Sequence, residues 1–279
     1  MSSERSAAPF DPAAVPIKDA STVLLIRDSD RGVEVFLQRR VVGMDFAGGM
    51  TVFPGGGVDP SDSDASVRWA GPSVAWWAER FKTTEGRAQA LVLAAVRETF
   101  EECGLLLAGP TEDTVVADTA PYAQARRRLE ARELSFGDFL AAEGLTVRTD
   151  LLRPRANWIT PLGERRRYDT NFFVAALPEG QRADGDTTEA EHVQWRTAVD
   201  ALEDWKSGAS ILLPPTWAQL TSLAGYRTVA EALADEIVIE PILPIMSRND
   251  AGQIHIAFGG DEGYYTGGGP HPWAARTDL

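Results

Sequence analysis

Three glutamates with helical spacing are the side chains of this sequence best suited to chemistry. They are Glu98, Glu101 and Glu102, within residues 97–104, which read Arg-Glu-Thr-Phe-Glu-Glu-Cys-Gly. At about 100° per residue, an α-helix places these carboxylates in one sector roughly 100° wide. Like charges this close repel each other, and a hard divalent cation that takes oxygen ligands removes the conflict. We therefore predict that the three glutamates bind Mg²⁺ or Mn²⁺.

The helix that must carry these glutamates is predicted to be amphipathic. Its apolar residues fall on the side opposite to the carboxylates, and they are Val92, Leu93, Val96, Phe100 and Cys103. Gly104 is the stop expected just past a helix end. Upstream, strand-like residues 50–53 lead into the glycines Gly55, Gly56 and Gly57. A backbone without Cβ atoms can approach a phosphate closely, although a tight structural turn is the alternative interpretation.

The acidic octet and the glycine turn together resemble the signature of the Nudix hydrolases. The residues that match its core are Arg97, Glu98, Glu101, Glu102, Gly104 and Leu105, and the run Phe53-Pro54-Gly55-Gly56-Gly57 resembles its opening turn. The resemblance implies a Nudix-type α/β/α sandwich with a mixed sheet, in the α+β class, with the acidic helix over the open end of the sheet. Strands that alternate with a few helices, without a regular βαβ period, also favour the α+β class. The implied activity is metal-dependent hydrolysis of a diphosphate bond in a nucleoside-diphosphate-linked substrate, with Mg²⁺ or Mn²⁺ as the cofactor.

One departure from the motif points to a subgroup. Forty residues separate Gly56 from Arg97, so residues 58 to about 85 read as an insertion inside the motif, and Gln89 stands where the motif has its first glutamate. An interrupted motif of this kind resembles the subgroup that contains the peroxisomal coenzyme A diphosphatases of the nudix-motif-19 type. That resemblance implies coenzyme A or acyl-CoA as the substrate. The residues leave ADP-ribose, NADH-type dinucleotides and a nucleoside triphosphate open, and also a non-catalytic, nucleotide-sensing Nudix module.

Further residues are candidates for catalysis and substrate binding. Arg97 is expected to orient the glutamates or the glycine turn by hydrogen bonding. The general base is Glu98 or Glu101, or an acid outside the helix. Glu189 and Glu191 are the candidates outside the helix, and solvated loop acids are the alternative interpretation for this pair. The candidate substrate-binding residues, besides the three glycines, are Arg39, Arg40 and Arg167.

The insertion carries apolar surface that must pack somewhere. Residues 72–81 are predicted to form a short helix with Trp76, Trp77 and Phe81. A coenzyme A substrate needs an apolar groove for its pantetheine or acyl chain, and these aromatic side chains are candidates for it. Packing within their own domain and a contact in a homodimer are the alternatives.

Composition and pattern together predict the organisation of the chain. The predicted parts are a disordered lead-in over 1–18, a Nudix domain over 19–258 with a second insertion at about 110–152, and a glycine-rich tail over 259–279 that is expected to be loop. The strands are predicted at 21–27 and 33–39, as a hairpin, and at 156–160, 171–176, 192–195, 237–245 and 253–258. The remaining helices are predicted at 122–133, 135–143, 198–206, 214–224 and 228–235.

Charge and cysteine usage indicate the environment and the class of partner. The net charge of −14 disfavours nucleic acid and membrane surfaces as partners. The sequence has no run of 18 apolar residues, so no transmembrane helix is predicted. Residues 1–16 lack the apolar core of a signal peptide. Cys103 is the only cysteine, which fits a reducing compartment. We therefore expect a cytoplasmic protein with a small nucleotide as its partner, and a homodimer as a further expectation.

Overall fold

A mixed sheet forms the centre of the protein. The computed structural model describes residues 11–43, 47–63, 66–248 and 252–273. Within them the sheet has the strand order β10-β2-β1-β9-β8-β11, with β3 paired to β2 and β4 paired to β1. Its strands are β1 (Ile17–Ser29), β2 (Gly32–Arg40), β3 (Thr51–Val52), β4 (Gly55–Gly57), β8 (Leu152–Ile159), β9 (Arg167–Ala176), β10 (Ala190–Thr197) and β11 (Pro241–Ile242). β1 runs parallel to β9 and β8 parallel to β11, whereas the other pairs are antiparallel.

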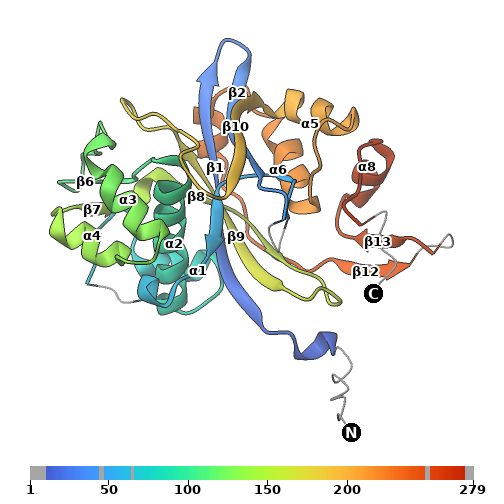
Figure 1. Cartoon of the computed structure of the whole chain (residues 1–279), viewed down its shortest axis with the longest axis horizontal. Coiled ribbons are helices and arrows are strands. Elements are labelled where there is room, and N and C mark those ends of the chain that lie inside the picture. Colours follow the sequence, from blue (N-terminus) through green and yellow to red (C-terminus); the bar gives the residue numbers. More distant parts are fainter. Residues whose placement is uncertain (1–10, 44–46, 64–65, 249–251, 274–279) are drawn as a thin grey trace, which may run out of the picture.

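Helices cover both faces of this sheet (Figure 1). The helices on one side are α1 (Val74–Arg80) and α2 (Glu85–Cys103), and those on the other are α5 (Ala198–Lys206), α6 (Pro214–Leu223) and α7 (Val229–Ala234). In β1, Val23 and Leu25 are buried with α2, whereas Leu24 and Ile26 are buried with the opposite helices. This division follows because successive side chains of a strand point to opposite faces of the sheet. The α/β/α sandwich confirms the predicted α+β fold.

Local sequence signals begin and end the elements that build the site. β1 and β2 form the predicted hairpin, and Gly32 at its turn has a φ of +106°. Helix α2 begins after Thr84, whose side-chain oxygen accepts the backbone N–H of Arg87. The helix ends at Gly104, in the left-handed region with a φ of +70°, a conformation that favours glycine. The predicted stop of the acidic helix at Gly104 is therefore confirmed.

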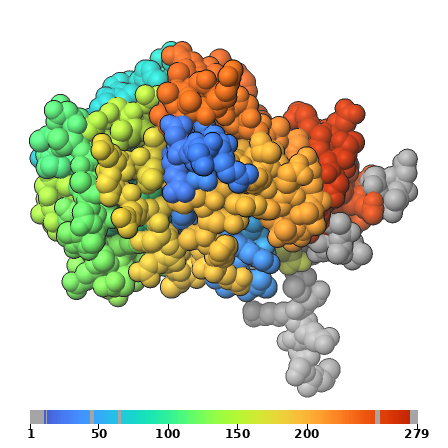
Figure 2. Space-filling view, turned by 90° about the horizontal axis from the view of Figure 1, so that it is seen from above, coloured from blue at the N-terminus to red at the C-terminus, as the bar shows by residue number. Residues whose placement is uncertain are grey.

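The two segments predicted to be insertions come together on the α2 side of the sheet. β5 (Trp69–Ala70), from the first segment, pairs in parallel with β7 (Thr146–Arg148), from the second, and β6 (Ala108–Gly109) pairs with β7. The helices predicted in these segments are confirmed as α1, α3 (Ala123–Glu130) and α4 (Phe136–Ala142), and Ser135 caps α4 as predicted. Figure 2 shows the green α3–α4 region on one side of the β1–β2 tip and orange C-terminal helices on the other.

Short 3-10 helices complete this part of the fold. They are η1 (Pro12–Ala14), η2 (Pro60–Ser63), η3 (Ala120–Tyr122) and η4 (Thr149–Leu151). The predicted lead-in over 1–18 is too long, because β1 begins at Ile17, and residues 1–10 lie outside the described residues. No helix in the described part of the chain is long and apolar enough to span a membrane.

The C-terminal segment contains more regular structure than the sequence predicts. β12 (Ile245–Arg248) and β13 (Ile254–Ala257) form a separate two-stranded sheet. The strand predicted over 237–245 is wrong for most of its length, since β11 is short and β12 begins only at Ile245. The loop predicted over 259–279 is wrong at α8 (Asp261–Thr266), and residues 274–279 lie outside the described residues.

An aromatic anchor explains why the glycine-rich tail forms a helix. Tyr264 of α8 is fully buried, and its ring stacks on Trp205 with 5.3 Å between ring centroids. Its hydroxyl donates to the carbonyl oxygen of Leu212 at 2.7 Å. Burial of a large aromatic ring and pairing of its hydroxyl stabilise an element whose glycines alone favour a loop.

Candidate active site

The last turns of α2 place the three predicted glutamates beside the glycine turn of β4. Gly55 donates its backbone N–H to Oε2 of Glu102 at 2.8 Å. A Cβ on Gly56 would lie 2.6 Å from Oε1 of Glu98, closer than real Cβ contacts. The absence of a side chain at Gly56 is therefore what lets the Glu98 carboxylate reach the turn.

Arg97 connects the glutamates to the turn and to a third element. Its Nη1 donates to Oε1 of Glu98 at 2.7 Å and lies 3.3 Å from the carboxylate of Glu101, while Nη2 donates to the carbonyl of Gly57 at 2.9 Å. Nε and Nη2 also form a forked ion pair with Asp62 of η2, at 3.0 and 2.9 Å. These are the bonds expected of a residue that orients both the glutamates and the turn.

Burial disfavours the ionised form of the three glutamates. Removal from water, together with the neighbouring carboxylates, raises the pKa of Glu101 to about 7 and that of Glu102 to about 8. Burial likewise raises the pKa of Glu98, although the Arg97 guanidinium opposes this. The charge of Glu189 also raises the pKa of Glu98 and Glu102, so this acid from outside the helix acts on the cluster.

The donor set suits a hard divalent cation in chemistry and in charge. The carboxylates gathered around the turn outnumber their cationic partners in the described residues. Two guanidinium groups, those of Arg97 and Arg40, pair here with carboxylates, and the carboxylates are Glu98, Glu101, Glu102, Asp62 and Glu189. Oxygen ligands and an excess of negative charge are what Mg²⁺ and Mn²⁺ require.

In this conformation the carboxylate oxygens of the three glutamates bond to groups of the protein. Among the described residues, no group of three His, Cys, Asp or Glu side chains converges so as to hold a metal ion. Glu98 and Glu101 are turned toward Arg97, and Glu102 toward Gly55. The residues therefore fit the cation in type and number, and metal binding by these glutamates stays a prediction that requires their side chains to rotate.

Two residues that bond to members of the cluster are not predicted from the sequence. Gln38 of β2 is buried and donates its side-chain N–H to Oε2 of Glu102, and its only signal is a polar residue that directly follows the apolar run Val35-Phe36-Leu37. Asp62 is fully buried against Arg97, although it stands 35 positions before it in a turn-like stretch. Glu102, held by Gln38 and Gly55, is buried behind the turn, whereas Glu98 and Glu101 line the adjacent cleft.

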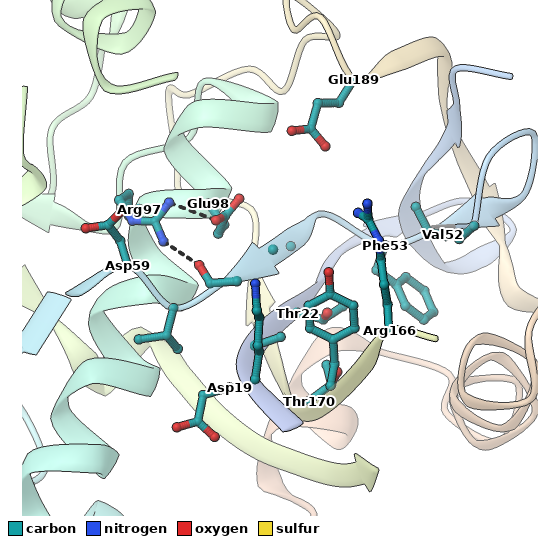
Figure 3. A pocket seen from close by; sticks show the side chains of 18 of the residues that line it. Asp19, Thr22, Val52, Phe53, Asp59, Arg97, Glu98, Arg166, Thr170 and Glu189 are labelled. Carbon is teal, nitrogen blue, oxygen red and sulfur yellow. Dashed lines mark hydrogen bonds and ion pairs between the residues drawn. The ribbon is translucent and has the colours of Figure 1, made fainter. Parts of the chain in front are cut away.

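A cleft of about 1560 Å³ opens beside the cluster, larger than the ~300–1,000 Å³ of most small-molecule sites. Figure 3 shows the Arg97–Glu98 pair on one side of it, Arg166 on the other, and Thr22 and Thr170 on the sheet between them. Glu189 lies above the turn, with its carboxylate directed toward the cluster (Figure 3).

The three arginines predicted to bind substrate differ in their surroundings. Arg40 lines the cleft and pairs with Glu189 at 2.7 Å. Arg39 is exposed and does not line the cleft. Arg167 is buried with its Nε–H donated to the carbonyl of Thr160, and its neighbour Arg166 lines the cleft instead.

Two further candidates lie away from the site. Glu191 is exposed and accepts the backbone N–H of Val42, so of the two outer acids only Glu189 lines the cleft. The groove predicted from Trp76 and Trp77 is wrong. Trp77 is fully buried between Phe81 and Phe173, and Trp76 packs beside it, so neither ring lines the cleft.

The sandwich, the glycine turn and the acidic helix with its arginine define a Nudix hydrolase. A model of the NUDT19 Nudix domain matches residues 78–223. That match covers more than half of the chain, and the chain therefore belongs to this family.

Relatives of known name agree with this assignment. The chain is 26% identical to acyl-coenzyme A diphosphatase NUDT19 of Xenopus laevis, across 82% of this chain and 70% of that protein. It is 30% identical to the Homo sapiens protein of the same name, across 62% of this chain and 50% of that protein, so it spans about half of the human relative. The crystal structure of a Nudix hydrolase from Alicyclobacillus acidocaldarius matches with a TM-score of 0.71 at 29% identity, covering 81% of this chain and 99% of that one.

Proposed function

We propose that this Nudix hydrolase cleaves the diphosphate of coenzyme A and acyl-CoA, releasing adenosine 3′,5′-bisphosphate and phosphopantetheine or its acyl thioester. The single observation that carries the proposal is the position of the acidic cluster in the wall of a long cleft. One end of that cleft is polar and the other apolar, which suits a substrate with a nucleotide at one end and a chain at the other. The names of the curated relatives support the same substrate class.

Glu98 and Glu101, with Glu102 behind them, are the residues that would hold Mg²⁺ or Mn²⁺. When bound, the cation supplies neutralisation of the diphosphate charge and a water of lowered pKa. The protein's own groups position the substrate. The backbone of the turn approaches the phosphates without Cβ atoms in the way, and Arg40 and Arg166 face them as guanidinium donors.

Glu189 is the acid we propose as the general base. Glu189 stands just before β10 and not on α2, and its carboxylate pairs with Arg40. In the reaction, the water oxygen bonds to phosphorus while the bond from that phosphorus to the bridging oxygen breaks. The water proton passes to the carboxylate, and the bridging oxygen leaves with the other phosphate.

A substrate panel tests this function. Purified protein is assayed with Mg²⁺ and with Mn²⁺ on coenzyme A, acetyl-CoA, a long-chain acyl-CoA, ADP-ribose, NADH and dGTP, and products are separated by chromatography. Cation-dependent release of adenosine 3′,5′-bisphosphate from the coenzyme A compounds is the expected result. Turnover of ADP-ribose or NADH alone would retain the chemistry and overturn the substrate. Tight nucleotide binding without turnover would favour a sensing module.

A further inference from the structure

The far end of the cleft is built from apolar side chains that no catalytic role requires. They come from the sheet and from the C-terminal half of the chain: Trp158, Phe172, Leu213, Ile256 and Trp273. All five belong to the same cleft as Glu98 and Glu101, so this apolar end is continuous with the reactive centre.

The strand register measures how far this end lies from the turn. Gly55 of β4 pairs with Thr22 of β1, and Thr22 pairs with Phe172 of β9. Trp158 of β8 in turn pairs with Thr170 of β9. Three steps between neighbouring strands, at about 4.8 Å each, separate the glycine turn from Trp158 by roughly 14 Å across the sheet. A compact substrate held at the turn would leave this end empty, whereas a long chain attached to the diphosphate would reach it.

Trp158 contributes an aromatic wall to this end. Its side chain is 4% exposed, and its ring packs against Phe258 with 5.4 Å between ring centroids. Because Trp158 lines the cleft, a bound chain would pack against this ring.

The wall opposite the sheet is held in place by the segment that was expected to be loop. The backbone N–H of Ile256 donates to the hydroxyl of Tyr265 at 2.7 Å. Trp205 donates its indole N–H to the carbonyl of Pro270 at 3.2 Å. These contacts fix β13 and the segment leading to Trp273 against the α5–α6 side of the sheet, so the apolar end has a defined shape and length.

The opposite end of the cleft differs in chemistry. It is lined by residues of α3, α4 and their connection, and the charged ones are of both signs: Arg128, Glu130, Arg132, Glu133 and Asp138. Figure 1 places α3 and α4 across the sheet from α6, α8 and β13. Burying an apolar chain against charged groups would remove their water without replacing it, and this leaves the apolar end for the chain.

We propose that the apolar end binds the acyl-pantetheine chain, with the chain packed against Trp158 and with Ile256 limiting the length of the acyl group. This inference rests on the proposed coenzyme A function. It assigns chain-length specificity to β13 and the C-terminal segment, and not to the aromatic insertion helix.

The test measures kcat/KM for coenzyme A, acetyl-CoA, octanoyl-CoA and palmitoyl-CoA. Ile256→Trp should lower the ratio of palmitoyl-CoA to coenzyme A at least tenfold, because the larger ring fills the end of the cleft. Ile256→Ala should raise that ratio, and it serves if the tryptophan variant folds poorly. Ile245→Trp, on the exposed neighbouring strand β12 and outside the cleft, is the matched control and should leave the ratio unchanged.

Ratios that stay constant in both Ile256 variants would overturn the assignment while coenzyme A hydrolysis by the wild type kept the proposed function. A wild type inactive on all coenzyme A compounds would overturn both.

Discussion

Arg97 of α2 and Asp62 of η2 form a forked, buried ion pair, in which Nε lies 3.0 Å from Oδ1 and Nη2 lies 2.9 Å from Oδ2. The pair joins the acidic helix to the segment that interrupts the signature motif. Because Arg97 also bonds to Glu98 and to Gly57, Asp62 indirectly fixes the geometry of the cluster. The interrupting segment thus contributes to the site through a carboxylate and not through its tryptophans.

Removal of Asp62 should therefore cost stability as well as activity. The Asp62 side chain is fully buried and that of Arg97 is 9% exposed, and breaking a buried pair from one side costs about 3–5 kcal/mol. We expect Asp62→Ala to lower the free energy of unfolding by about that amount in urea denaturation. Asp113→Ala is the control, because Asp113 is exposed and its carboxylate accepts a hydrogen bond from nearby Thr111. Equal effects in the two variants would contradict the structural role of the pair.

A matched pair of glycine substitutions tests the contact between the turn and the helix. A Cβ on Gly56 would meet Oε1 of Glu98 at 2.6 Å, whereas a Cβ on Gly57 would meet only the carbonyl of Asp19 at 3.9 Å. Gly56→Ala must displace the Glu98 carboxylate, and a misplacement of about 1 Å can cost ~100-fold in rate. We expect a large loss of kcat in Gly56→Ala and a much smaller loss in Gly57→Ala. Similar activities in both variants would show that Glu98 need not sit against the turn.

The raised pKa values predict how stability depends on pH without metal. Burial raises the pKa of Glu101 to about 7 and of Glu102 to about 8, above the unfolded value near 4.5. The folded state then binds more protons than the unfolded state, so this contribution to stability is complete below about pH 4.5 and is lost as pH rises through 7 and 8. In EDTA, the Tm should fall between pH 5.5 and 8.5, and Mg²⁺ or Mn²⁺ should raise it more at pH 8.5.

Variants separate this effect from titration elsewhere in the protein. Glu102→Gln carries no charge at any pH, so it should flatten the fall in Tm between pH 5.5 and 8.5 and weaken the gain from metal. Glu143→Gln, at the exposed end of α4, should retain the wild-type profile. A wild-type Tm that does not fall over this range would argue against buried, neutral glutamates in the cluster.

The two outer acids provide a second matched pair. Glu189 lines the cleft and pairs with Arg40, whereas Glu191 is exposed and accepts the N–H of Val42. Glu189→Gln should lower kcat at least ~100-fold if it is the general base, in line with the 10²–10⁴ contribution of such groups. Glu191→Gln should remain active. Comparable activity in both would return the role of base to Glu98 or Glu101.

Arg132 adopts a backbone conformation that favours glycine, and this predicts a stabilising substitution. Its φ is +57°, just after α3, where its N–H bonds to the carbonyl of Leu129. Arg132→Gly should raise the free energy of unfolding by about 1 kcal/mol, because the left-handed region costs a residue with a Cβ roughly that much. Arg132→Ala keeps the Cβ and should show no such gain. Urea denaturation of both variants decides between these outcomes.

Features encoded by neighbouring residues were predictable from the sequence. The hairpin of β1 and β2, the end of α2 at Gly104 and the cap of α4 at Ser135 each depend on a few consecutive residues. The spacing of Glu98, Glu101 and Glu102 likewise placed all three beside one turn, because helical geometry is local.

Contacts between distant segments were not predictable in this way. The partnership of Asp62 with Arg97 spans 35 positions, and Asp62 lies in a stretch whose composition indicates only a turn. Arg167 is the arginine that the sequence predicts for substrate binding, but its neighbour Arg166 lines the cleft, because adjacent residues leading into a strand point to opposite sides. The glycine-rich tail concealed α8, whose order depends on burial of Tyr264 against Trp205.

We expect water to attack phosphorus of the coenzyme A diphosphate under the control of the acidic cluster. Hydrolysis of coenzyme A in H₂¹⁸O with Mg²⁺, followed by mass spectrometry of both products, tests this mechanism. We predict one ¹⁸O in the phosphate of one product for the wild type and no product for Glu98→Gln. Equal cleavage by Glu98→Gln, or cleavage that leaves both phosphates unlabelled, would contradict this mechanism.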